Sequence, residues 1–234
     1  MLGARHLLVV ALAALAVCAL TRRTAALDAR RQGAALRLAA LLVPLLELSH
    51  AVWLYRAGVK QLVKLLPLHL CGMQSIFIPL AVFTKRACFK DFVYATSLLG
   101  GVFGILFPAG VADYYPLWHF QTIQTVLLHM LLAYVPLALI ATGRHLPSAR
   151  RFPQVLGMFL GVALVAGVVD RVWGQNYMFL SAAPEGTPLV WVMNTFGRPV
   201  YLVVTFLLLA GLSLVIHLPF GAREGAPRPA HQRG

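Results

Sequence analysis

The sequence predicts an all-α protein, a polytopic membrane helical bundle with about seven transmembrane helices. The chain has 234 residues, of which 60% are hydrophobic and only 12% carry a charge. Its apolar residues form long continuous blocks, whereas the strands of a transmembrane β-barrel alternate between apolar and polar residues. Because a helix needs about 20 apolar residues to cross a bilayer, blocks of this kind indicate membrane-spanning helices.

Seven apolar blocks come near the required length. They lie at roughly residues 5–20, 35–55, 66–84, 91–107, 117–141, 153–173 and 197–217. The shorter blocks can still span, because the bilayer thins locally and polar side chains at their flanks reach the interface. We therefore expect residues 1–220 to form a single transmembrane helical domain. Residues 221–234 are rich in Gly, Pro and Arg and hold no apolar run, which predicts a disordered basic tail.

The first block has two interpretations. Arg5 followed by an apolar run that ends near Cys18 is also typical of a signal peptide. The pair Arg22-Arg23 directly after the run favours instead the flank of a helix that stays in the membrane. We expect a retained helix, with a cleaved signal peptide as the alternative.

The net charge of +13 does not indicate a nucleic-acid partner, because the basic residues lie mostly in loops and in the tail. Loops rich in Lys and Arg stay on the cytoplasmic side. This rule predicts a multi-pass protein of the cell membrane with its N-terminus outside and its C-terminus in the cytoplasm. The loop with Arg56, Lys60 and Lys64 is an exception, since it falls on the predicted outside. The basic residues of the predicted inside are Arg22, Arg23, Arg30, Arg31, Lys85, Arg86, Lys90, Arg144, Arg150, Arg151, Arg223, Arg228 and Arg233.

Polar side chains within apolar blocks are costly in a membrane and often mark functional sites. Placed on the predicted topology, most of them fall in the outer half of the bilayer, which predicts a polar cavity open to that side. Glu47 and His50 lie about one helical turn apart, so they can also simply satisfy each other. The other members of the set are His69, Cys71, His119, Gln121, Gln124, His129, Asp170 and Asn176.

Cys71 and His129 are the candidates for covalent chemistry. Pro67 suits the first turn of a helix, which would place Cys71 near a helix N-terminus that stabilises a thiolate. His69 points to a different face of such a helix, so His129 from another helix is the better base. A buried cysteine is otherwise an inert small hydrophobic residue.

Two further expectations concern cysteines and metals. The three cysteines, Cys18, Cys71 and Cys88, form no even framework, so we expect no disulfide. A zinc site is the competing chemistry, but its possible ligands are dispersed and form no tight motif, so we expect neither a metal nor another cofactor. These possible ligands are Glu47, His50, His69 and His129.

Several motifs resemble the YwaF family, bacterial integral membrane proteins related to animal transmembrane protein 164. They are Leu66-Pro67-Leu68-His69-Leu70-Cys71, the Gly100-Gly101 span, His129, and Asn176-Tyr177-Met178-Phe179-Leu180 followed by Pro184-Glu185-Gly186. The resemblance covers roughly residues 35 to 220. Animal relatives are attributed a cysteine-dependent acyltransferase activity on lysophospholipids. The resemblance implies that its Cys and His correspond to Cys71 and His129.

The leading hypothesis is a membrane enzyme that moves an acyl chain between phospholipid and lysophospholipid, with membrane lipids as partners. Cys71 would be the nucleophile and His129 the proton shuttle. The residues that would bind or orient the substrate are Glu47, His69, Asn176 and Tyr177. The alternative is a proton-coupled transporter or a lipid- or solute-binding protein without covalent chemistry, in which Glu47 and His129 line a passage. A third interpretation is a structural protein whose polar residues only hold helices together.

Overall fold

The computed structural model describes residues 3–84, 86–107, 111 and 114–221. Throughout these residues the regular structure is helical, which confirms the predicted class. The α-helices are α1 (Ala4–Ala25), α2 (Ala29–Arg56), α3 (Gln74–Phe83), α4 (Ala87–Leu106), α5 (Phe120–Ala141), α6 (Phe152–Trp173) and α7 (Pro188–Gly221). Three short 3-10 helices, η1 (Leu62–Leu65), η2 (Ala149–Arg151) and η3 (Tyr177–Phe179), lie in the connections. The predicted disordered tail lies outside the described residues except for Gly221.

Six of the described helices are long and apolar enough to cross a membrane, and α3 is not. The predicted third span, residues 66–84, is therefore wrong as a single helix: only ten residues of it, Gln74–Phe83, are helical. The cause is Pro67, because the residue before a proline is excluded from helical backbone angles. Leu66 is accordingly extended, with φ −70° and ψ 139°.

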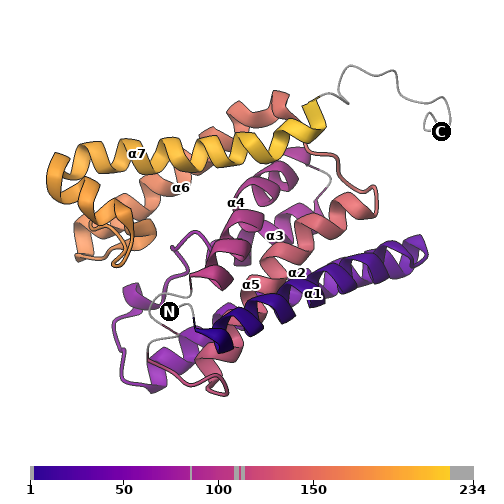
Figure 1. The fold of residues 1–234 in the computed structure, drawn as a ribbon, viewed down its shortest axis with the longest axis horizontal. Helices are drawn as coiled ribbons and strands as arrows, with labels where there is room; N and C mark the ends of the chain where they lie inside the picture. The colour runs from indigo at the N-terminus through magenta and orange to yellow at the C-terminus, as the bar shows by residue number, and fades with distance from the viewer. Residues whose placement is uncertain (1–2, 85, 108–110, 112–113, 222–234) are drawn as a thin grey trace.

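Helix α4 lies at the centre of the bundle (Figure 1). It packs against α5 over most of its length, and α1 and α2 lie beside α5 on one side. Helices α6 and α7 contact α4 from the other side. The backbone in the middle of α4 is thus enclosed by neighbouring helices, whereas α1, α2, α6 and α7 expose many Leu and Val side chains. Such side chains are suited to contact with lipid.

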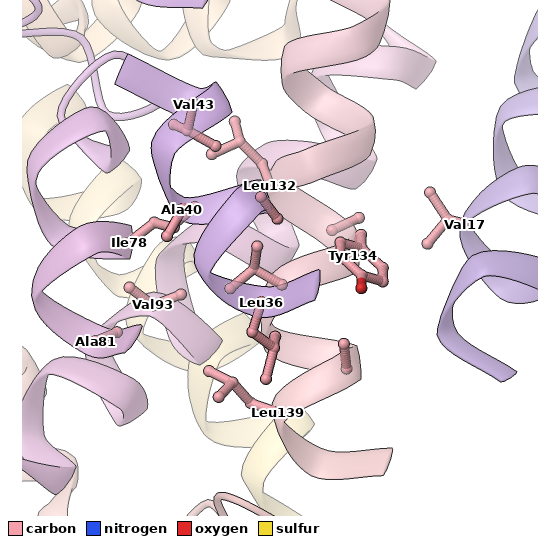
Figure 2. Packing of buried hydrophobic residues seen from close by; sticks show 14 of the residues in the cluster. Val17, Leu36, Ala40, Val43, Ile78, Ala81, Val93, Leu132, Tyr134 and Leu139 are labelled. Carbon is pink, nitrogen blue, oxygen red and sulfur yellow. The ribbon is translucent and has the colours of Figure 1, made fainter. Parts of the chain in front are cut away.

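The main core forms where α2, α3, α4 and α5 meet (Figure 2). Small residues such as Ala40, Ala81 and Ala133 are fully or almost fully buried there. In a membrane, small residues let helix backbones approach closely and pack by van der Waals contact. The N-terminal helix is part of this bundle: Val17 belongs to the core, and the hydroxyls of Thr24 and Tyr134 lie 2.9 Å apart across α1 and α5.

The bundle has two ends. At the one we call the basic end, the start of α4 meets the loop after α5, where Lys90 Nζ donates to the carbonyl of Arg144 at 3.3 Å. A Cβ on Gly33, near the start of α2, would lie 3.5 Å from the Arg144 guanidinium. At the other, which we call the cavity end, Trp53 of α2 packs edge-on against His119 before α5, with ring centroids 5.7 Å apart.

The start of α1 and the end of α7 lie at opposite ends. At the cavity end, Nε2 of His6 in α1 donates to the carbonyl of Leu106 at 3.1 Å. Tyr94, near the start of α4, donates to the carbonyl of Ile216 at the basic end, at 2.6 Å. Since six long helices alone would leave both termini at the same end, the stretch 57–83 supplies the remaining crossing. The orientation of these ends in the cell membrane stays a prediction.

Helix α7 is longer than the predicted seventh span and replaces part of the predicted loop before it. Its first turns, from Pro188, are separated from the rest by a kink at Gly197, where φ is 80°. A positive φ of this kind is open to glycine at little cost. The kink allows the first turns of α7 to take a different direction from the long apolar part that follows.

Candidate functional site

Cys71 lies just before α3 and not in its first turn, which corrects the prediction. Helix α3 begins at Gln74, with Met73 as its N-cap. The N–H of Gln74 donates to the carbonyl of Cys71 itself, and the next N–H, of Ser75, donates to the carbonyl of Gly72. Because these donors are already used by backbone carbonyls, they are not available to stabilise a thiolate at Cys71.

Glycines of α4 bring Cys71 and His129 to one helix face. A Cβ on Gly100 would lie 3.3 Å from the Sγ of Cys71, and a Cβ on Gly104 would lie only 2.0 Å from the His129 ring. Residues four apart share a face of a helix. The half-buried thiol and the imidazole therefore lie against successive turns of α4, where a Cβ at Gly104 would clash with the ring and a Cβ at Gly100 would be in tight contact with the sulfur. Gly101, between them, meets the α5 backbone, with a Cβ position 2.7 Å from the carbonyl oxygen of His129.

The tautomer of His129 is fixed by a backbone contact. Its Nδ1 lies 2.7 Å from the carbonyl oxygen of Thr125, and a carbonyl oxygen can only accept. The proton is therefore on Nδ1, and Nε2 keeps its lone pair and faces Gly104. No hydrogen bond joins His129 to Cys71 within the described residues.

The carboxylate of Glu47 lies beside the turn that carries Cys71. A Cβ on Gly72 would lie 2.8 Å from Oε1 of Glu47. Glu47 and His50 lie close enough to interact electrostatically, yet no hydrogen bond joins them within the described residues. Nδ1 of His50 lies instead 2.8 Å from Oε1 of Gln121 on α5. Glu47 makes no hydrogen bond with any described side chain or backbone group. This carboxylate is thus free to meet a ligand or a proton.

A cavity of about 480 Å³ opens at the cavity end. It gathers most of the sequence-predicted binding residues, and neither Cys71 nor His129 is part of its lining. His69 is exposed to it and packs against Tyr177 and Phe179, with ring centroids 5.0 and 5.6 Å away. The described lining residues are Glu47, His50, Leu54, Lys64, Leu65, Leu66, Pro67, His69, Gln175, Asn176, Tyr177 and Phe179.

The hydrogen bonds that the Asn176 side chain makes within the described residues all go to its own loop. Its Oδ1 accepts from the backbone N–H groups of Ser181 and Ala182, both at 2.9 Å, and its Nδ2 donates to the carbonyl of Ala182 at 3.0 Å. An amide engaged in this way shapes the loop. The loop in turn forms one wall of the cavity.

Tyr177 anchors the same loop from both ends. Its hydroxyl donates to the carbonyl of Val63, and its backbone N–H donates to Oδ1 of Asp170 at 2.7 Å. Burial, together with the charge of Asp170, raises the pKa of the Tyr177 hydroxyl, so it stays a donor. The two residues that follow, Met178 and Phe179, have φ of 52° and 58°, which is strained for residues other than glycine. Strain of this kind is concentrated at functional sites.

Sequence reasoning missed a cluster at the basic end. The side chain of Asp91 is fully buried and accepts from His145 at 3.0 Å, from the Ser148 N–H at 3.2 Å and from Arg151. The available signal was an acidic residue at the start of an apolar block, facing a loop with His and Arg. From the sequence, Asp170 is expected only as one member of the polar set, with no role of its own, yet its Oδ2 is buried without a hydrogen-bond partner among the described residues.

The alternative of a zinc site gains no support from this geometry. Within the described residues, no three His, Cys, Asp or Glu side chains gather closely enough to hold a metal ion. His50 is turned toward Gln121, and His129 lies on the α4 glycine face, away from the cavity that His69 lines. Three of the four residues, Glu47, His50 and His69, line one cavity without coming close enough together for a metal ion, and His129 lies apart from them.

Comparison with known proteins identifies the family. The model of the TMEM164 family matches residues 1–216, and the chain belongs to this family. The match extends the resemblance, which covered roughly residues 35 to 220, through the N-terminal helix. Comparison with curated proteins found no match to the chain, and comparison with solved structures found none either. The chain is therefore a multi-pass membrane protein of the TMEM164 family.

Proposed function

We propose that this member of the TMEM164 family transfers an acyl chain between a phospholipid and a lysophospholipid, with Cys71 as nucleophile and His129 as base. One observation carries the proposal: the thiol of Cys71 and the imidazole of His129 rest on successive turns of one glycine face of α4. The Nε2 lone pair of His129 is on that face. A thiol and a base of this kind form the minimum set for covalent acyl transfer.

In the first step, the thiol proton moves to Nε2 of His129 as the sulfur attacks the ester carbonyl of the donor phospholipid. The carbon–oxygen bond of the ester then breaks, the protonated His129 returns the proton to the leaving alkoxide, and a lysophospholipid departs. In the second step, His129 takes the proton of the acceptor hydroxyl, whose oxygen attacks the thioester. The carbon–sulfur bond breaks, and the proton returns to the sulfur of Cys71.

The polar cavity, whose residue Glu47 lies beside the turn that carries Cys71, suits the headgroup of the lipid. Glu47 lies against the Cys71 turn and makes no hydrogen bond within the described chain, so its carboxylate can meet a cationic or hydroxyl group of the substrate. His69 is exposed to the same cavity. Asn176 and Tyr177 would act through the loop wall that they hold. An acyl chain would lie among the apolar side chains of the bundle.

A carrier is the second candidate, and one observation favours it. The stretch from Ala57 to Met73 is mostly non-helical and enters the bundle beside a polar cavity, before the ten-residue α3. Interrupted helices that line a cavity are typical of transporters. In that case Glu47 would exchange protons, and Cys71 would have no chemical role.

Intact-protein mass spectrometry of the detergent-purified chain incubated with phospholipid tests the proposal. We expect an adduct of acyl mass on the wild type that neutral hydroxylamine removes. Cys71→Ala should abolish it, and Cys88→Ala, which removes another half-buried thiol, should keep it. His129→Gln should slow its formation about 100-fold or more. Acyl transfer by folded Cys71→Ala at the wild-type rate would overturn the mechanism, and solute flux in liposomes would then support the carrier.

A further inference from the structure

A second cavity, of about 340 Å³, lies at the cavity end between α1, α4 and α5. We call it the α1 groove. Its walls are mainly apolar and include Val9 of α1, Ile105 of α4 and Val126 of α5. It shares no described lining residue with the polar cavity. Its volume is at the lower end of the range for small-molecule sites, about 300–1,000 Å³.

Among the described lining residues of the groove, Arg5 carries the charge, and that charge is positive. Arg5 and His6 are its titratable basic residues, and no acidic side chain is among its described lining. His6 donates to the carbonyl of Leu106. Arg5 is exposed and has neither a hydrogen bond nor an ion pair with any described residue. An unpaired guanidinium at the edge of an apolar groove is complementary to an anionic group on an apolar body.

The groove lies at the level where lipid headgroups are expected. Tyr115 and Trp118 line it, and the Trp118 side chain is 80% exposed. Tyr and Trp are concentrated at the membrane–water interface. Arg5 stands on the first turn of α1, at the same end of the bundle. The polar mouth of the groove is therefore at the interface, and the apolar part of the same groove continues along α1 toward Val9.

The floor of the groove is the back of the His129 site. Gly104 and Thr125 both line it. Gly104 lies against the His129 ring, and the Thr125 carbonyl accepts from its Nδ1. A chain that fills the groove would thus rest on the two residues that hold His129 in place.

We propose that the α1 groove binds an anionic phospholipid, with its phosphate at Arg5 and one acyl chain along Val9 and Val126 to Gly104. The exposed guanidinium of Arg5 favours this occupant, because it can meet a phosphate, whereas the described lining holds no carboxylate that would meet the cation of a zwitterionic headgroup. Binding in the groove does not require Cys71, so this proposal can be correct whether or not the protein transfers acyl chains.

Native mass spectrometry of the detergent-purified full chain tests this site. The probes are phosphatidylglycerol and phosphatidylcholine with identical acyl chains. We expect one phosphatidylglycerol to be retained in preference to phosphatidylcholine. Arg5→Gln should weaken this retention about fivefold, as expected for one lost cation–phosphate contact. Arg22→Gln, which removes an exposed arginine from the other end of the same helix, should leave it unchanged.

A second variant keeps the test independent of charge. Val9→Trp fills the apolar part of the groove and should lower phosphatidylglycerol retention to the level of phosphatidylcholine, while Cys71→Ala should retain the lipid fully. Equal retention of the two lipids by the wild type, or equal losses in Arg5→Gln and Arg22→Gln, would overturn the proposal in favour of unspecific lipid contact. Displacement of phosphatidylglycerol by equimolar oleate would overturn it in favour of a fatty-acid site.

Discussion

The two ends of the bundle each hold a carboxylate, and the two carboxylates have opposite surroundings. At the basic end, Asp91 is fully paired: one carboxylate oxygen accepts from His145 and the Ser148 N–H, and the other accepts from Arg151. At the cavity end, Glu47 makes no hydrogen bond within the described residues. The two carboxylates sit on α2 and α4 of one bundle, so the difference lies in the partners that surround them.

Other buried polar atoms without a hydrogen-bond partner among the described residues occur at both ends, and Oγ1 of Thr21 and Nε2 of His217 are the two toward the basic end. Two such atoms lie at the cavity end, Oδ2 of Asp170 and Nε2 of Gln121. Both are buried without a hydrogen-bond partner among the described residues, and Oε1 of the same Gln121 side chain contacts His50. A buried polar group without a partner costs about 1–3 kcal/mol. A group that is fully paired holds the fold, whereas a group left unpaired at such a cost is available to a ligand. The comparison of the two carboxylates therefore assigns a structural role to Asp91 and leaves Glu47 available for binding.

The largest effect on stability is expected at the basic end. Asp91→Ala removes the acceptor of three donors, and the protein should lose about 3 kcal/mol of unfolding free energy. This is the lower end of the range for a broken buried ion pair, because Arg151 is about one-third exposed and can turn to water. Thermal unfolding of the detergent-purified variant measures the loss. A melting temperature equal to that of the wild type would show that this cluster does not hold the fold.

A smaller effect on stability, with a large effect on activity, is expected at the α4 glycine face. Gly104→Ala places a Cβ 2.0 Å from the His129 ring, so the ring must move. Overpacking of this kind costs about 1–3 kcal/mol. A base displaced by about 1 Å lowers the rate about 100-fold. Melting temperature and acyl transfer measured on the same preparation separate the two effects.

Gly161→Ala is the matched control for this variant. Gly161 lies within α6, and a Cβ there would meet nothing within 4 Å. Replacing a helical glycine by alanine at such a site should stabilise the protein by about 0.5–1 kcal/mol. Its activity should equal that of the wild type. If Gly104→Ala retained full acyl transfer, the position of the α5 residue His129 against Gly104 of α4 would not matter for catalysis.

Much of the fold could be predicted from the sequence, because six apolar blocks are long enough to span on their own. The prediction of one helix over residues 66–84 was wrong for a local reason, because Pro67 keeps Leu66 extended. The mean hydropathy of a block does not depend on such a restriction of the backbone at a single residue. That failure moved Cys71 out of the expected first turn of a helix. A prediction that disfavours helix at the residue before each proline would have separated residues 57–73 from α3.

The site could be predicted only in part, because its members meet across helices. Polar residues in apolar blocks pointed correctly to Glu47, His69 and their common cavity. Sequence spacing could not show that Glu47 would face Gly72 while His50 turned to Gln121, since that depends on how α2 rotates against α5. The spacing of Gly100, Gly101 and Gly104 is visible in the sequence and is typical of closely packed membrane helices. Which side chains it would admit became clear only in space.

The smallest effect on stability is expected for Glu47→Gln, and this variant tests the comparison most directly. The substitution removes the charge and keeps the size. Because the carboxylate has no hydrogen bond to lose within the described residues, the free energy of unfolding should change by no more than about 0.5 kcal/mol. If Glu47 meets the substrate, acyl transfer should fall about tenfold or more, mainly through a higher KM, because a lost contact to the headgroup weakens binding more than chemistry. Large destabilisation by Glu47→Gln would place this carboxylate with Asp91 among the groups that hold the fold, and the contrast between the two ends would disappear.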